Sequence, residues 1–210
     1  MRRLLILSFA GLVILAGMAF LWLRPGQKFD STDQRLEMFP HPQKAYDFQL
    51  VDQDDKPFRL GQLRGKAVLF TFGFTHCPNI CPTTLADLAA AYRSLPKSVQ
   101  ERTCVLFISV DPERDSPKVL KEYVPFFDEH FIGLTGSALQ IAKAAKEYGV
   151  IYEKQSEPNH GANDYNIQHS TYVYVIGPDG KWRGLYRRDQ IKDPERIAND
   201  VKQMLAASHG

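Results

Sequence analysis

The 210-residue chain has few cysteines and no strong excess of charge of either sign. Its 26 basic and 24 acidic residues leave a formal net charge of +2, and no run of lysines and arginines occurs, so nothing electrostatic favours a nucleic-acid partner. Only three cysteines are present, whereas a disulfide-stapled scaffold uses more of them in a shorter chain. Cys77 and Cys81 lie close together and Cys104 is distant, a pattern that favours metal or redox chemistry over stapling.

Several cysteine patterns are also missing. The spacing matches neither the ligand pairs of zinc sites nor a Cys-x-x-Cys-His haem attachment. No Pro-x-x-x-Thr-x-x-Cys pattern precedes Cys77 or Cys81, which argues against a peroxidase. No cysteine closely follows the apolar segment near the N-terminus, which excludes a lipoprotein anchor there.

One long hydrophobic run is present, at the N-terminus. Residues 4–23 carry no charge, and twenty helical residues span roughly 30 Å, the thickness of a hydrocarbon core. We expect residues 1–3 to be a short cytoplasmic N-terminus, residues 4–23 a single transmembrane anchor, and the rest to lie outside the cytoplasm. The alternative is a cleaved signal peptide, because residues 17–19 (GMA) have the small side chains of a cleavage site, although the apolar run continues beyond them.

The remaining chain divides into a linker and one domain. Residues 24–45 combine prolines, glycine and mixed charge without a steady period, which is typical of a linker. Residues 46–208 form the domain. Within it, the runs 67–74 (AVLFTFGF) and 104–110 (CVLFISV) indicate strands buried on both faces, with a helix over 83–94 between them. Two buried strands joined through a helix predict a parallel pair with a right-handed crossover.

Shorter elements complete an α/β pattern around these two strands. In chain order, the sequence predicts a hairpin over 47–60, a helix from Ser116-Pro117 to about Glu129, a strand over 131–134, a helix over 138–148, a strand over 150–154, a polar loop over 155–165, strands over 171–176 and 181–186, and a helix over 193–207. The closing hairpin and helix are those of a thioredoxin-like fold. In such sheets, functional groups gather at the carboxyl ends of the parallel strands.

The cysteine pair lies at such a strand end. Segment 74–82 (FTHCPNICP) falls where the first buried strand leads into its helix, and Pro78 suits a first helical position. The positive potential and unpaired N–H groups at a helix N-terminus favour a thiolate at Cys77. If both cysteines are helical, their side chains are neighbours on one face, where they can hold one soft metal ion or close a disulfide.

A third ligand would complete a trigonal Cu(I) site or supply the nitrogen that Cu(II) accepts. His169 directly precedes the strand over 171–176, at the place where a thioredoxin-like fold brings a loop, usually with a cis-proline, against its cysteines; here the loop is Gln168-His169-Ser170. The residues alone also allow an ordinary structural histidine. We expect His76 to point away from the thiols and His160 to be a solvated residue of a polar loop. The remaining histidines have no such context: His41, His130 and His209.

Three segments resemble the SCO/SenC copper chaperones: 70–88 (FTFGFTHCPNICPTTLADL), 108–117 (ISVDPERDSP) and 169–180 (HSTYVYVIGPDG). The resemblance covers roughly residues 45–205. It implies a copper site formed by Cys77, Cys81 and His169, exposure to the periplasm or the mitochondrial intermembrane space, and delivery of Cu(I) or Cu(II) to the binuclear copper centre of cytochrome c oxidase subunit II. Position 79 departs from the pattern, because Asn79 stands where many members have Asp, which lowers the negative charge beside the cysteines.

Two functions therefore stay open. A metallochaperone would bind and deliver copper, with a copper donor protein or a thiol reductase as further partners. A thiol–disulfide oxidoreductase would keep the cysteines of the same oxidase subunit reduced, with Cys77 as the attacking thiolate and Cys81 as the resolving thiol. The chain is an enzyme only under the second hypothesis. His169 separates the two, because a dithiol enzyme has no need of it.

Two further features indicate structure more than chemistry. Cys104 opens a buried strand, where a free cysteine behaves as a small hydrophobic residue. The segment 111–115 (DPERD) follows the carboxyl end of the second buried strand, so it borders the site, and we expect it to shape the loop and pair charges.

Overall fold

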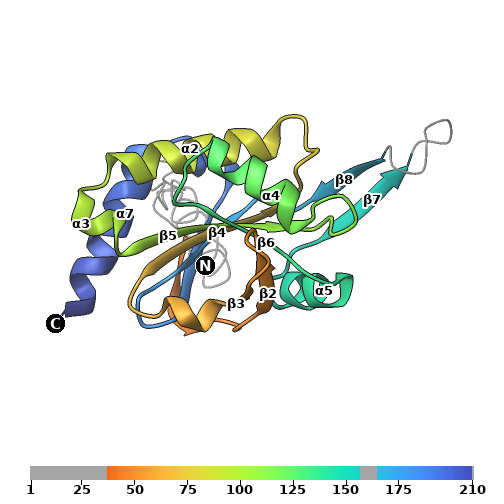
Figure 1. Ribbon diagram of the computed structural model, residues 1–210. Coiled ribbons are helices and arrows are strands. Elements are labelled where there is room, and N and C mark those ends of the chain that lie inside the picture. Colours follow the sequence, from red (N-terminus) through yellow and green to blue (C-terminus); the bar gives the residue numbers. More distant parts are fainter. Residues whose placement is uncertain (1–36, 157–164, 210) are drawn as a thin grey trace, which may run out of the picture. The chain divides into compact units, whose positions relative to one another are not determined.

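The computed structural model describes residues 37–156 and 165–209. A mixed eight-stranded sheet runs through this part of the chain in the order β1-β10-β9-β4-β5-β6-β2-β3 (Figure 1). Its strands are β1 (Glu37–Lys44), β2 (Gln49–Asp52), β3 (Pro57–Arg59), β4 (Ala67–Gly73), β5 (Thr103–Ser109), β6 (Ile132–Thr135), β9 (Val173–Ile176) and β10 (Lys181–Tyr186). A separate two-stranded sheet pairs β7 (Tyr152–Ser156) with β8 (Tyr165–His169).

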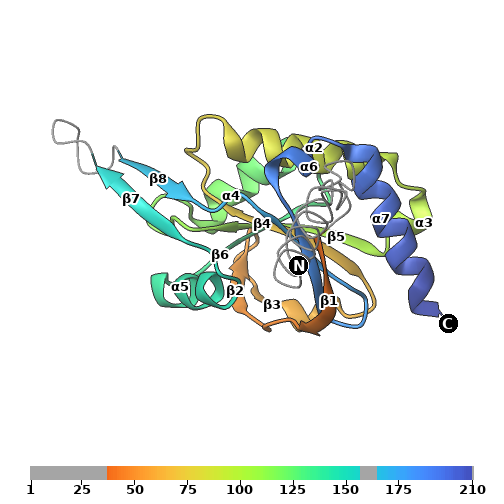
Figure 2. The same cartoon turned by 180° about the vertical axis from the view of Figure 1, so that it is seen from behind.

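Helices cover both sides of the large sheet. They are α2 (Ile80–Ser94), α3 (Lys97–Gln100), α4 (Pro117–Tyr123), α5 (Ala138–Glu147), α6 (Arg188–Ile191) and α7 (Pro194–Ala206), with short 3-10 turns η1 (Leu60–Leu63), η2 (Val124–Phe126) and η3 (Ala207–His209). Helices α2, α4 and α7 lie on one side of the sheet and α5 lies on the other (Figures 1 and 2). The longest two, α2 and α7, pack against each other.

Strands β4 and β5 form the centre of the fold. Every residue of both strands is buried, as the two uninterrupted apolar runs predict. They pair in parallel without a register shift, from Ala67 opposite Thr103 to Gly73 opposite Ser109. Both strands therefore end at the same edge of the sheet, and the loops that follow them meet there.

The remaining elements complete the predicted thioredoxin-like α/β arrangement. Helix α2 connects the parallel pair, β9 lies antiparallel to β4, and β10 lies antiparallel to β9. Helix α7 then packs onto α2 and β4. The hairpin of β2 and β3 extends the other edge of the sheet through β6.

The N-terminal side of the domain begins earlier than the sequence predicts. Residues 37–44, which we assigned to a linker over 24–45, form β1 and pair with β10 at the edge of the sheet. The segment contains Pro40 and Pro42, and prolines within a run argue against a central strand because they cannot donate to the ladder. An edge strand tolerates them, and the register of β1 shifts between Met38 and Gln43, around both prolines.

Two other boundaries differ from the prediction. The helix expected to reach Glu129 ends at Tyr123, because Pro125 lacks a backbone donor and leaves a short 3-10 turn instead. The polar loop expected over 155–165 is bounded by paired strands, since β8 begins at Tyr165 and ends at His169. The hairpin of β7 and β8 projects beyond the large sheet (Figure 1).

The predicted N-terminus (1–3) and transmembrane anchor (4–23) lie outside the described residues. Within 37–156 and 165–209, no helix combines the length and apolar character that a membrane span requires.

Candidate metal centre

Three elements bring one set of metal-binding atoms together. Cys77 lies in the turn after β4, Cys81 lies in the first turn of α2, and His169 ends β8. Their ligand atoms all lie within 4.8 Å of one another, and no other group of three His, Cys, Asp or Glu residues in the described part of the chain does so. The loop between β4 and α2 lies beside the base of the β7–β8 hairpin (Figures 1 and 2). The structure thus brings together the three residues that the resemblance implied.

The turn before α2 differs from the expected geometry. The helix starts at Ile80 after Asn79, so Pro78 is not helical and Cys77 lies in a turn, where its N–H donates to the carbonyl of Phe74 at 3.2 Å. The cysteines still meet, because the backbone N–H of Cys81 donates to Cys77 Sγ at 3.4 Å. This N–H is one of the unpaired donors of the first helical turn, so the sulfur of Cys77 partly caps the helix.

The two cysteines hold one proton between them. A hydrogen bond from the Cys81 thiol, followed by smaller contributions from His169 and the backbone N–H groups of Cys81 and Asn79, lowers the pKa of Cys77 to about 3 against the opposing effect of burial. The same hydrogen bond, together with burial, raises the pKa of Cys81. At neutral pH, Cys77 is therefore a thiolate and Cys81 a thiol.

The imidazole of His169 is oriented toward the cysteines. Its Nδ1 lies 2.8 Å from the carbonyl oxygen of Ser170, which can only accept, so the ring proton belongs on Nδ1. The other ring nitrogen, Nε2, faces Cys81 Sγ at 3.4 Å. The ring packs edge-on against Phe74, with centroids 5.8 Å apart. Metal-binding histidines are commonly oriented by such a bond from the second ring nitrogen.

The loop after β5 supports the cysteine turn, as its position predicts. Asp115 is fully buried, and its carboxylate accepts from the backbone N–H of Thr75 at 3.0 Å, the Thr75 hydroxyl at 2.6 Å and the Ser109 hydroxyl at 2.6 Å. Burial raises the pKa of Asp115. These bonds join the residue two positions before Cys77 to the end of β5.

Other candidate residues lie apart from this centre. His76 is exposed, and its Nδ1 bonds to the Thr75 hydroxyl at 3.1 Å, so it is not part of the ligand group. Cys104 is buried near the start of β5, at the other end of the strand, and burial raises its pKa to about 12, which suits the predicted structural role. His130 bonds to Asp128 at 2.9 Å. His160 lies outside the described residues.

Tyr123 is a residue near the site that the sequence pattern does not reveal. Its ring packs against Phe107 with centroids 5.5 Å apart, and its buried hydroxyl has no hydrogen-bond partner among the described residues. Burial, and then the charges of Cys81 and Cys77, raise its pKa. It stands at the end of α4, and no local motif connects that position with the cysteines.

Gly73 permits the close approach of α2 to the end of β4. A Cβ atom at this position would lie 2.7 Å from Cys81 Sγ and 2.7 Å from Phe107 Cε2. Both distances are far below ordinary contact. A side chain at Gly73 would therefore displace the sulfur, the ring or both.

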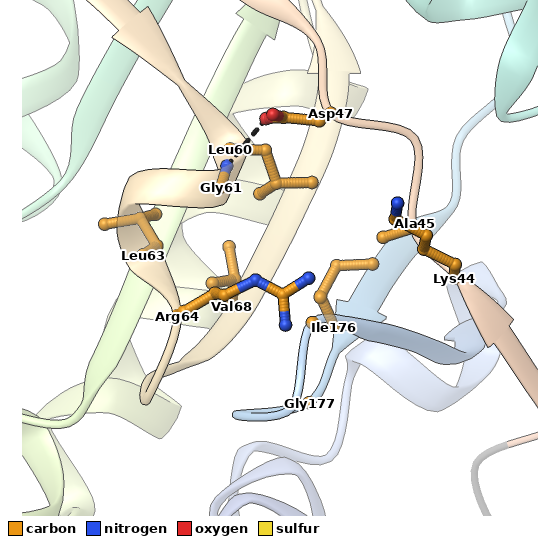
Figure 3. Close-up of a pocket in the computed structure, with 11 residues that line it drawn as sticks. Lys44, Ala45, Asp47, Leu60, Gly61, Leu63, Arg64, Val68, Ile176 and Gly177 are labelled. Atoms are coloured by element: carbon orange, nitrogen blue, oxygen red, sulfur yellow. Dashed lines mark hydrogen bonds between the residues drawn. The ribbon is translucent and has the colours of Figure 1, made fainter.

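A shallow pocket of about 150 Å³ lies at the opposite end of β4 from the cysteines (Figure 3). Val68, Ile176 and Leu60 line it, and Asp47 at its rim accepts from the backbone N–H of Gly61 at 2.7 Å. Arg64 spans it and donates to the carbonyl of Asp179 at 2.8 Å. Ligand pockets usually measure roughly 300–1,000 Å³, so this pocket is too small to compete with the metal centre as a functional site.

The chain is similar to known proteins in both sequence and structure. The family model described as SCO1/SenC matches residues 37–206. The chain is 35% identical over 212 residues to the mitochondrial SCO2 homolog of Mus musculus, covering 99% of this chain and 80% of that protein. It is similar to Bradyrhizobium japonicum ScoI with copper bound, with a TM-score of 0.69, 35% identity, and coverage of 77% of this chain and 99% of that one. It is also similar to a structure described as identifying a disulfide switch in BsSco, a member of the Sco family of cytochrome c oxidase assembly proteins, with a TM-score of 0.61, 28% identity, and coverage of 80% and 97%.

The shared proton of the cysteine pair predicts an unusual pH profile. In the reduced protein, the rate of alkylation of Cys77 by iodoacetamide should stay nearly constant from about pH 5 to about pH 8. The rate for an ordinary thiol instead falls about tenfold for each pH unit below its pKa. Cys81→Ala removes the principal hydrogen-bond donor, so the pKa of Cys77 should rise and the pH dependence should return. Rates measured by mass spectrometry test this. In the unsubstituted protein, an alkylation rate that falls steadily as the pH is lowered from about 8 to about 5 would contradict the thiolate assignment.

Gly73→Ala should damage both the fold and the cysteine pair. Overpacking of this kind costs about 1–3 kcal/mol of unfolding free energy, measurable by urea denaturation. Gly133→Ala is a matched control, because its Cβ would lie 2.8 Å from Val124 Cγ2 and 3.0 Å from Leu120 Cβ, away from the cysteines. Both variants should lose stability, but only Gly73→Ala should change the alkylation profile of Cys77. Equal profiles in the two variants would show that Gly73 does not set the position of Cys81.

Proposed function

The chain belongs to the SCO1/SenC family, and from that premise we propose that it binds one copper ion through Cys77, Cys81 and His169 and delivers it to the binuclear copper centre of cytochrome c oxidase subunit II. The resemblance of the three sequence segments is thereby confirmed at the level of the family. The observation that carries the proposal is the convergence of two sulfur atoms and one imidazole nitrogen within 4.8 Å.

The donor atoms suit copper. Thiolates are soft ligands that select Cu(I), and imidazole nitrogen is accepted by both copper oxidation states. A structural zinc site is usually tetrahedral with four protein ligands, whereas the group here contains three among the described residues. Copper in the Bradyrhizobium japonicum relative supports the same choice.

The protonation of the apo site is favourable for loading. Cys77 is already a thiolate and does not have to lose a proton, and the imidazole of His169 already directs Nε2 toward the site. Cys81 has to release its proton when it becomes a ligand. Asp115, through Thr75, holds the turn that carries Cys77 in place.

The different exposure of the ligands suggests how copper leaves. Cys81 is 3% exposed, whereas Cys77 and His169 are only partly buried, and Pro78 and Asn79 beside them are exposed. A partner's ligand would therefore approach from the side of Cys77 and His169. Three protein ligands leave room for such a group to bind before the first of them dissociates, so transfer can proceed by stepwise exchange without a free ion.

The proposal includes a membrane anchor at residues 4–23 and a location in the periplasm or the mitochondrial intermembrane space. Strand β1 begins at Glu37 opposite Leu185, toward the sheet end where β4 reaches the cysteines, and runs away from them to Lys44. Residues 24–36 can span at most roughly 45 Å when fully extended. An anchored domain would thus keep its copper site within reach of a membrane-bound oxidase subunit.

Thiol–disulfide exchange is the second candidate, because the same pair contains a low-pKa thiolate beside a buried thiol. That arrangement suits attack by Cys77 and resolution by Cys81. The disulfide switch named for BsSco supports it. The two functions are compatible in one chain, since a disulfide cannot bind copper and the redox state therefore controls loading.

Copper binding tests the ligand set directly. The reduced protein should bind one copper per chain, and the Cys77→Ser/Cys81→Ser variant or the oxidised protein should bind none. His169→Ala should weaken Cu(II) binding by more than the roughly 10–100-fold that loss of an outer-shell partner costs, and should weaken Cu(I) binding less, because two thiolates remain. His76→Ala is the matched control and should bind as the unsubstituted protein does. Full stoichiometry in the double cysteine variant would refute the site.

A cellular assay separates delivery from thiol chemistry. If copper delivery is the main function, a His169→Ala strain grown at low copper should contain oxidase that lacks copper, and added copper should partly restore it. If reduction of thiols is the main function, that strain should have near-normal oxidase, and only Cys77 or Cys81 variants should lose it. Oxidase activity and copper content of the purified enzyme are the measurements.

A further inference from the structure

We propose that Arg114, acting with Asp111 and Tyr165, is the positioning device for the histidine ligand: it holds strand β8 against the loop after β5 and thereby places the imidazole of His169 on the cysteine pair. The inference deepens the proposed function and rests on it for the identity of the metal. The three residues are called the Arg114 cluster below.

Arg114 connects the two segments through several contacts at once. Its Nη1 donates to the backbone carbonyl of Tyr165 at 2.9 Å, and its guanidinium lies 3.6 Å from the centre of the Tyr165 ring. It also lies 5.8 Å from the ring centre of Phe74. The side chain is 12% exposed, so these contacts are shielded from water.

Asp111 closes the cluster from the other side. It accepts from the Tyr165 hydroxyl at 2.6 Å and forms an ion pair with Arg114 Nε. Its own backbone N–H donates to the Ser109 hydroxyl at 2.9 Å, which fixes it to the end of β5. Each member of the cluster therefore contacts the other two, and the buried carboxylate has two partners for its charge.

Strand β8 connects Tyr165 directly to His169. Side chains alternate along a strand, so Tyr165, Ile167 and His169 share a face of β8, and Ile167 between them is 3% exposed. Phe74 provides a second path, since its ring contacts both the Arg114 guanidinium and the His169 imidazole. A movement of Tyr165 away from Arg114 would carry the ligand with it.

The hairpin depends on such side contacts for its placement. Strands β7 and β8 pair with each other and belong to no larger sheet, and an isolated two-stranded hairpin is marginally stable at best. A second ion pair, Lys154 to Glu113 at 2.6 Å, also joins the hairpin to the loop after β5, but its side chains are 42% and 69% exposed. Exposed pairs contribute little. Because Lys154 Nζ also lies 4.6 Å from the centre of the Tyr165 ring, the matched control for the buried cluster changes Glu113, which leaves that contact in place.

Arginine is suited to this role and lysine is not. A planar guanidinium can lie over an aromatic ring while it donates to two acceptors, whereas an ammonium group is a compact charge that does not stack in this way. Arg114→Lys keeps the charge and loses the geometry. Tyr165→Phe keeps the ring beneath the guanidinium and removes only the hydroxyl that bonds to Asp111.

The experiment compares Arg114→Lys and Tyr165→Phe with the control Glu113→Gln, in the full chain. Amide hydrogen exchange of the reduced, metal-free protein should speed up in β7 and β8 in the first two variants and stay unchanged in the control. Cu(II) affinity should fall by roughly 10–100-fold in Arg114→Lys, the usual cost of losing an outer-shell partner, with weaker nitrogen hyperfine coupling in the Cu(II) EPR spectrum. Cu(I) affinity and the rate of disulfide formation should change much less.

A double-substitution cycle shows whether the effect passes through the ligand. In a His169→Ala background, Arg114→Lys should cause no further loss of Cu(II) affinity, because the group that it positions is gone. An equal loss in both backgrounds, or hydrogen exchange in Arg114→Lys that matches Glu113→Gln, would overturn the proposal. If Arg114→Lys does not fold, Tyr165→Phe is subjected to the same cycle with the same criteria. Absence of copper binding by the unsubstituted protein would refute the proposed function alone, since hydrogen exchange of the metal-free protein still tests the cluster.

Discussion

The parallel pairing of β4 with β5 is the constraint on which the site depends. Seven residues of each strand pair without a shift, so Gly73 and Ser109 end at the same level and the two following loops meet at one edge. Asp115 then bonds across that edge to Thr75, which holds the turn of Cys77. The Arg114 cluster uses the same loop to hold β8. Both supports of the ligand set therefore start from the carboxyl end of β5, where parallel sheets commonly place their chemistry.

At this site, electrostatic interactions give the two cysteines different protonation states. The sulfur of Cys77 accepts from the thiol and the backbone N–H of Cys81 and is a thiolate at neutral pH, whereas the buried Cys81 keeps its proton. One ligand is thus ready for a soft cation, and one gives up its proton on binding. The same difference in pKa between the two thiols would suit thiol–disulfide exchange. Only the histidine distinguishes the two chemistries, which is why the contacts that place His169 matter most for assigning the function.

Local sequence patterns predicted the elements whose signal lies within a few residues. The buried strands, the helix between them and the closing hairpin follow from apolar runs and turn residues, and the structure confirms them. The misses have specific causes. The prolines in β1 argued against a strand there, but β1 lies at the edge of the sheet, where prolines are tolerated. Pro78 suits a first helical position, but a turn precedes the start of α2 at Ile80. Strand β8 was not predicted, because its short YNIQH sequence has a single buried aliphatic residue, Ile167.

By itself, the sequence determined the fold class and the cysteine pair, because uninterrupted apolar runs and a spacing of four residues are short-range properties. It also supplied the resemblance that singled out His169. Only the tertiary structure decided that His169 Nε2 lies 3.4 Å from Cys81 Sγ, 88 positions away in the chain, that Cys77 and not Cys81 is the thiolate, and that Arg114 faces Tyr165. Such contacts join residues with no common local pattern. They arise where strand ends, loops and a separate hairpin pack together, and that packing is a property of the whole domain.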